Sequence, residues 1–186
     1  ADVINSAGNG SDAATMILAL DWLTDEGVRV VNMSLAGPYN KLLDRAVGVA
    51  AQRGMMIVAA AGNSGPRSSP RFPAGFDEVI AVTAIDADRR LYSGAVRGDH
   101  IDVAAPGVDV FVNAVGEGRF VTGTSIAAPF VSAMILADPA LLASPDTAAL
   151  RDRLAARTED LGRPGSDRQF GAGLVQARDI CTPGTG

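Results

Sequence analysis

The sequence predicts an α/β domain with a mainly parallel sheet and helices on both of its faces. Helix-like and strand-like segments alternate along the first hundred residues, which is typical of this class. The strand-like segments are short apolar runs rich in Val, Ile and Ala, as expected of strands that are buried on both faces. With 186 residues, of which 47% are hydrophobic and 20% charged, the chain can enclose a core of this kind.

The first helix and strand are predicted within the first 33 residues. Residues 12–23 carry apolar side chains at helical spacing, and Ser11 is expected to cap this helix. Gly27 ends the helix, and the apolar residues of 28–33 predict a strand.

A second helix and three more strands follow. Residues 41–53 repeat the helical pattern and end at Gly54. The uninterrupted apolar run at 55–61 predicts a parallel strand buried on both faces. Two shorter strands are predicted at 79–84 and 101–104.

The last third of the chain is predicted to be loop-rich at first and then helical. Between Pro106 and Phe120 we expect loops with short extended pieces. A helix is predicted over 125–136, and another is expected to begin at Ser144 and Pro145, with the serine as cap. In such folds the sites form at the carboxyl ends of the strands.

Composition excludes several classes of partner. The net charge is -5, Lys41 is the single lysine and no basic run occurs, so neither nucleic acid nor an anionic membrane is an expected partner. No apolar run approaches the roughly 20 residues that span a bilayer. Cys181 is the single cysteine, so an intrachain disulfide is excluded, while the compartment stays open.

The strongest functional motif is Gly-Thr-Ser-Ile-Ala-Ala-Pro at 123–129. Gly123 permits a close backbone approach just before Ser125. Ser125 opens an apolar helix, whose free N–H groups and dipole favour a developing negative charge. A serine that merely caps the helix is an equally good interpretation of this spacing.

The motif resembles the nucleophile segment Gly-Thr-Ser-x-Ala-x-Pro of the subtilisin family of serine endopeptidases. Five further segments resemble family elements and occur in the family's order: 30–37, 59–63, 72–82, 102–107 and 170–175. Together the six matches span most of residues 28–177, so chance agreement is excluded as an explanation.

The resemblance implies roles for individual residues. Ser125 would attack the peptide carbonyl and form an acyl-enzyme, while its backbone N–H and the Asn63 amide would stabilise the oxyanion. Taken alone, Asn63 in Gly-Asn-Ser-Gly-Pro is more typical of a turn, and the oxyanion role is preferred because Ser125 and the intervening matches accompany it. A substrate strand would pair with the backbone of 34–37, and a pocket would form beside it. The substrate-binding residues implied are Ser34, Leu35, Ala36, Gly37, Ala61, Gly62 and Thr124.

A serine nucleophile requires a general base, and the sequence offers only His100. We expect His100 to be a solvated loop residue rather than the base. The family order is Asp, His, Ser, and no histidine follows Ser125. We therefore expect residues 1–186 to be a single partial catalytic domain whose Asp and His lie upstream of Ala1. Such a chain would lack meaningful activity, and it would self-associate through its exposed sheet.

Two other functions are considered. A pseudoprotease would keep the fold as a binding or scaffold module without a triad. A nucleotide-binding domain is disfavoured, because no glycine run has the required Gly-x-Gly-x-x-Gly spacing. The expected partner is a peptide or protein substrate, with no cofactor and no assigned metal. A secreted or periplasmic location follows from the resemblance alone.

Overall fold

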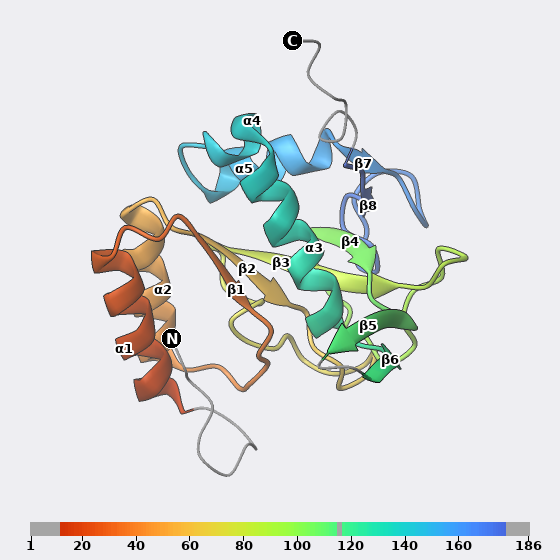
Figure 1. The fold of residues 1–186 in the computed structure, drawn as a ribbon, viewed down its shortest axis with the longest axis horizontal. Coiled ribbons are helices and arrows are strands. Elements are labelled where there is room, and N and C mark those ends of the chain that lie inside the picture. The colour runs from red at the N-terminus through yellow and green to blue at the C-terminus, as the bar shows by residue number, and fades with distance from the viewer. Residues whose placement is uncertain (1–11, 115–116, 178–186) are drawn as a thin grey trace.

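A computed structural model of the protein describes residues 12–114 and 117–177. A six-stranded sheet forms its centre (Figure 1), with the strand order β1-β2-β3-β4-β8-β7. The first five strands in this order run parallel, and β7 is antiparallel to β8. The strand bounds are Val30–Met33 (β1), Met56–Ala60 (β2), Val79–Ile85 (β3), Val103–Pro106 (β4), Thr158–Glu159 (β7) and Leu174–Val175 (β8).

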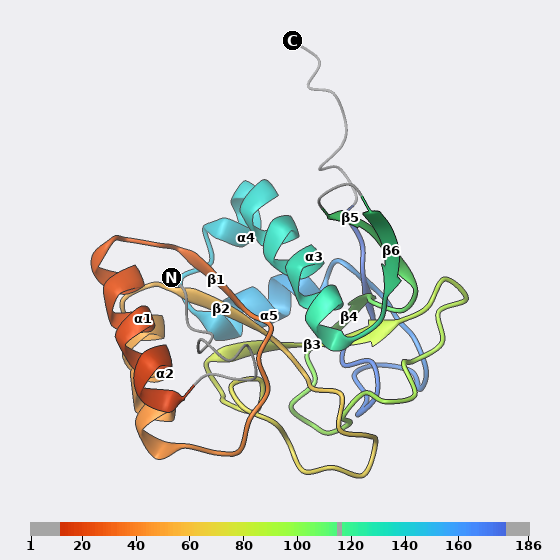
Figure 2. The same ribbon diagram turned by 60° about the horizontal axis from the view of Figure 1, so that its bottom comes forward.

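Helices cover both faces of the sheet, as Figures 1 and 2 show. Their bounds are Ala13–Asp25 (α1), Lys41–Gln52 (α2), Thr124–Ala137 (α3), Pro139–Leu142 (α4) and Thr147–Ala155 (α5). Buried residues of α1 and α2 pack on one face, and those of α3, α4 and α5 pack on the other. The predicted fold class, a mainly parallel sheet between helical layers, is confirmed.

Strand β2 shows why the sheet is buried on both sides. Its side chains alternate between the two helical layers: Ile57 and Ala59 join the core under α1 and α2, whereas Val58 joins the core under α3. All five β2 residues are buried. The uninterrupted apolar run in the sequence is therefore the direct signature of a two-sided core.

A hairpin stands where the sequence predicts loops with short extended pieces. Strand β5 (Val110–Ala114) pairs antiparallel with β6 (Glu117–Val121), and the hairpin leads into α3. The short elements α4, β7 and β8 were also not predicted, because two to four residues carry too little periodicity.

The helix caps differ from the predicted ones. The predicted cap Ser11 and the single cysteine Cys181 lie outside the described residues, and Asp12 caps α1 by accepting a 2.8 Å hydrogen bond from the Thr15 N–H. The predicted cap Ser144 is wrong, because Asp146 caps α5 and accepts from the Ala149 N–H at 2.8 Å. Of the helices in the described part of the chain, none combines the length and apolar character that a membrane span requires.

Candidate active site

The parallel sheet brings the predicted site residues together at one edge. Ser34 follows the end of β1, and Asn63 lies three residues beyond the end of β2. Helix α3 begins at Thr124 over the same edge, so Ser125 stands in its first turn (Figure 1). Segments about sixty and ninety residues apart in the chain thus meet at the carboxyl ends of neighbouring strands.

Two donors on Thr124 orient the Asn63 side chain. The Thr124 N–H donates to Asn63 Oδ1 at 3.0 Å, and the Thr124 hydroxyl donates to the same oxygen at 2.9 Å. The Thr124 hydroxyl in turn accepts from the buried Gly62 N–H at 3.0 Å. Because a backbone N–H can only donate, the Asn63 atom that faces Thr124 must be the oxygen. The Asn63 amide nitrogen is therefore turned away from Thr124.

That nitrogen shares a space with the nucleophile. A Cβ placed on Gly123 would lie 3.0 Å from Asn63 Nδ2 and 3.2 Å from Ser125 Oγ. The absent side chain of Gly123 leaves room between the amide donor and the hydroxyl. No side chain caps α3 at Gly123, and first-turn amides such as that of Ser125 have no acceptor within the helix. An oxyanion formed at Ser125 would meet both donors here.

A chain of side-chain hydrogen bonds fixes Ser125 relative to β1. The Ser34 hydroxyl donates to the Ser125 carbonyl at 2.9 Å and accepts from Asn32 Nδ2 at 2.9 Å. The Ser132 hydroxyl, seven residues or about two helical turns further along α3, donates to Asn32 Oδ1 at 3.3 Å. Asn32 and Ser132 were not predicted as site residues. The one signal in the sequence is a polar residue, Asn32, within an otherwise apolar strand.

The predicted substrate-binding residues lie at the same edge, with one restriction. Ser34 and Leu35 are half-buried, Ala36 is exposed, and Ala61 and Gly62 are buried behind Asn63. The backbone of Gly37, however, already pairs with Phe72, donating at 2.8 Å and accepting at 3.0 Å. Gly37 is therefore already paired within the described part of the chain, unlike the rest of the predicted segment 34–37.

His100 lies at the opposite edge of the sheet. It comes just before β4, at the amino end of that strand. β4 runs parallel to β3 and β2, and Asn63 follows the carboxyl end of β2, so the two residues lie at opposite ends of the strands. The prediction that His100 is not the base agrees with this position. The expectation that it is solvated is wrong: both ring nitrogens are buried without a hydrogen-bond partner. Burial lowers the pKa of His100. The charge of Asp99 raises this pKa, and the charge of Arg168 lowers it further.

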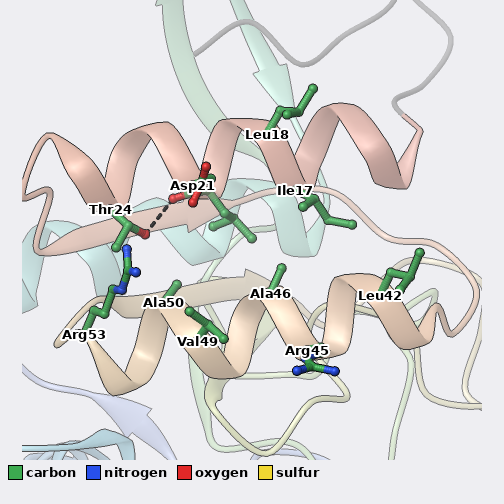
Figure 3. A pocket seen from close by; sticks show the side chains of 11 residues that line it. Ile17, Leu18, Asp21, Thr24, Leu42, Arg45, Ala46, Val49, Ala50 and Arg53 are labelled. Carbon is green, nitrogen blue, oxygen red and sulfur yellow. Dashed lines mark hydrogen bonds between the residues drawn. The ribbon is translucent and has the colours of Figure 1, made fainter.

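Two other features were considered as ligand sites. A groove of about 450 Å³ runs between α1 and α2 and is lined by apolar side chains such as Ile17, Leu18 and Leu42 (Figure 3). It lies on the face of the sheet away from α3 and shares no residue with the Ser125 site. Among the described residues, no three His, Cys, Asp or Glu side chains are grouped so as to hold a metal ion.

The chain is similar in sequence to known proteins. Subtilisin DY of Bacillus licheniformis is 37% identical over 182 residues, covering 93% of this chain and 64% of its own length. The minor extracellular protease Epr of Bacillus subtilis is 35% identical over 181 residues, covering 94% of this chain and 27% of its own. The chain thus spans less than two thirds of these relatives.

Solved structures and a family model point the same way. The structure of fervidolysin from Fervidobacterium pennivorans, a keratinolytic enzyme related to subtilisin, superimposes with a TM-score of 0.78 and 27% identity. The match covers 89% of this chain and 28% of fervidolysin. The model of the subtilase family matches residues 1–173. The chain belongs to the subtilase family.

Proposed function

We propose that this chain is the nucleophile-bearing part of a serine endopeptidase. The observation that carries the proposal is the space at Gly123, where a Cβ would lie 3.0 Å from Asn63 Nδ2 and 3.2 Å from Ser125 Oγ. A helix cap needs no oriented amide beside it, whereas acyl transfer needs a nucleophile and an oxyanion donor next to each other.

The reaction would proceed in two displacements. Ser125 Oγ attacks the carbonyl carbon and gives its proton to a base, and the oxyanion accepts from Asn63 and the Ser125 N–H. The base returns the proton to the leaving amine as the C–N bond breaks, which leaves an ester on Ser125. Water then cleaves the ester. Because His100 lies at the opposite sheet edge, the base and its carboxylate partner would come from residues outside this chain.

A peptide or protein substrate would lie in an extended conformation across this edge. Its residues before the scissile bond would pair with the backbone of 34–36, next to the walls formed by Ala61 and Gly62. Thr124 contributes by orienting Asn63. We also propose a secreted or periplasmic location, which is supported by the extracellular relative Epr.

We further propose that the chain on its own is inactive and associates with a second copy of itself. Strand β1 forms one end of the sheet order, so one of its edges has no neighbour among the described strands. Phe130 and Leu136 are 45% and 56% exposed on α3, which lies beside β1. Unpaired strand edges and exposed apolar side chains both favour association.

The product of the complete gene tests the catalytic proposal. It should hydrolyse a tetrapeptide p-nitroanilide and react with a fluorophosphonate probe at Ser125. Ser125→Ala should abolish both. Asn63→Ala should lower kcat about 100- to 1000-fold with little change in KM, a magnitude measured for this donor in a subtilisin rather than derived from this structure. Peptide binding without hydrolysis or labelling would contradict the proposal and favour a pseudoprotease.

A further inference from the structure

The two faces of the β5–β6 hairpin differ in an unusual way. Phe111 and Phe120 form a cross-strand pair on one face and are 59% and 69% exposed. The neighbouring pair on the other face, Val110 and Val121, is half-buried. The solvent-facing side of an antiparallel ribbon normally carries polar residues. Here it carries two aromatic rings.

The two rings contact each other and form one continuous apolar surface. Their centroids lie 5.4 Å apart at an interplanar angle of 62°, an edge-to-face arrangement. The Phe111 ring also lies across Gly118 on the opposite strand, where a Cβ would overlap the ring. A glycine at this position therefore leaves room for the far end of the Phe111 ring against β6. We call Phe111, Gly118 and Phe120 the aromatic shelf.

The shelf is tied closely to the nucleophile. β6 ends at Val121, and Thr122 and Gly123 connect it to α3. The Gly123 N–H donates to the Gly107 carbonyl at 2.8 Å, and the Asp109 N–H donates to the Thr122 hydroxyl at 2.9 Å. These bonds fix the base of the hairpin against the first turn of α3. Phe120 precedes Ser125 by five positions, so their Cα atoms lie within about 18 Å.

The shelf and β1 approach Ser125 from opposite sides. Ser34 reaches the Ser125 carbonyl from the end of β1, at one side of the sheet. The hairpin follows β4, three strands away, and meets the same turn from its other side (Figure 1). A peptide that pairs with 34–36 and continues past Ser125 in the same direction would run toward the hairpin.

We propose that the aromatic shelf binds an apolar side chain of the substrate on the leaving-amine side of the scissile bond. This inference rests on the proposed endopeptidase function and specifies its substrate class. An extended peptide advances about 3.3 Å per residue, so the side chain concerned is among the first five after the scissile bond. The occupant is the substrate itself, because the shelf continues directly into the catalytic turn.

Matched quenched peptides in the complete gene product test the shelf. The peptides are identical before the scissile bond and carry Leu or Ser at each of the following five positions in turn. Wild type should prefer Leu at one position by about tenfold in kcat/KM. The double variant Phe111→Ser with Phe120→Ser should lose most of this preference. Hydrolysis of a p-nitroanilide, which lacks residues on the leaving side, should not change.

Two further variants control for folding. In Gly118→Ala only the far end of the Phe111 ring has to move, so the hairpin should stay folded while the preference falls. Trp22→Ser removes another exposed aromatic side chain, 52% exposed on α1, and should leave the preference unchanged.

The outcomes separate the shelf from the catalytic proposal. Anilide hydrolysis with no leaving-side preference, or with a preference that survives the double variant, overturns the shelf alone. A double variant that changes only the oligomeric state also overturns it and makes the shelf a contact between copies. Failure of wild type to hydrolyse the anilide overturns the catalytic proposal and the shelf with it.

Discussion

At the scale of single residues, the structure adds the orientation of side chains that the sequence could only name. Asn63 and Ser125 were predicted from their motifs, but the direction of the Asn63 amide follows from Thr124, which supplies two donors to its oxygen. Asn32 and Ser132 could not be predicted, because their hydrogen bond joins residues one hundred positions apart. Side-chain contacts of that range leave no local pattern in a sequence.

His100 gives the protein an acid-sensitive position. Its two ring nitrogens are buried without partners, and burial lowers its pKa below the usual value of 6.5. Asp99 and Arg168, which act on it in opposite directions, form an ion pair with each other at 3.1 Å. The unfolded chain therefore binds a proton at His100 at a higher pH than the folded chain does. The stability associated with neutral His100 is present above the unfolded pKa and is lost as the pH falls through the folded one.

We expect His100→Gln to reduce the loss of thermal stability at acid pH. Between about pH 8 and pH 5, the Tm of wild type should fall more than that of the variant, because the variant has no imidazole to protonate. Thermal unfolding followed by circular dichroism at several pH values measures both slopes. If the Tm of wild type and variant fall equally with pH, carboxylates rather than His100 govern the loss of stability at acid pH.

At the scale of elements, prediction followed the strength of the local pattern. The apolar run of β2 and the helical spacing of α2 were predicted to within two residues. The hairpin was not, since its two strands lie within a segment that holds three glycines, Pro106, Asp109 and Asn113, residue types that favour loops. The start of α5 was misplaced because Ser144 and Asp146 are both good caps. Only backbone geometry decides between two such residues.

The cap of α5 gives a stability prediction. Asp146→Ala removes the acceptor for the Ala149 N–H and a negative charge at the helix start, so it should cost about 1 kcal/mol. Ser144→Ala is the control: the Ser144 hydroxyl accepts only from Arg153, at 3.2 Å, and it should cost less. Urea unfolding of both variants measures the difference. A larger loss for Ser144→Ala would contradict the assignment of the cap.

At the scale of the whole molecule, the described sheet is covered by helices on both faces, whereas β1 at one end of its strand order has an unpaired edge. Two buried clusters, one under α1 and α2 and one under α3 to α5, enclose the strands from both sides. The fold class could be predicted because this arrangement requires apolar runs in the central strands. The exposure of Phe130 and Leu136 could not, since apolar spacing around a helix does not reveal which side has a neighbour.

Those two side chains make the proposed self-association testable. In sedimentation velocity at tens of micromolar, the 19.0 kDa chain should sediment as a dimer or larger species. The double variant Phe130→Glu with Leu136→Glu places charges beside the unpaired edge of β1, so it should shift the chain toward monomer. The control, Leu42→Glu with Val49→Glu, adds equal charge on the exposed side of α2, where both residues line the groove of Figure 3, and should leave association unchanged. A monomeric wild type would contradict self-association itself. If only the α2 variant dissociates the dimer, the contact lies at the groove instead. Either interface would be stabilised by burying apolar surface, so a charge placed in the true interface should weaken it.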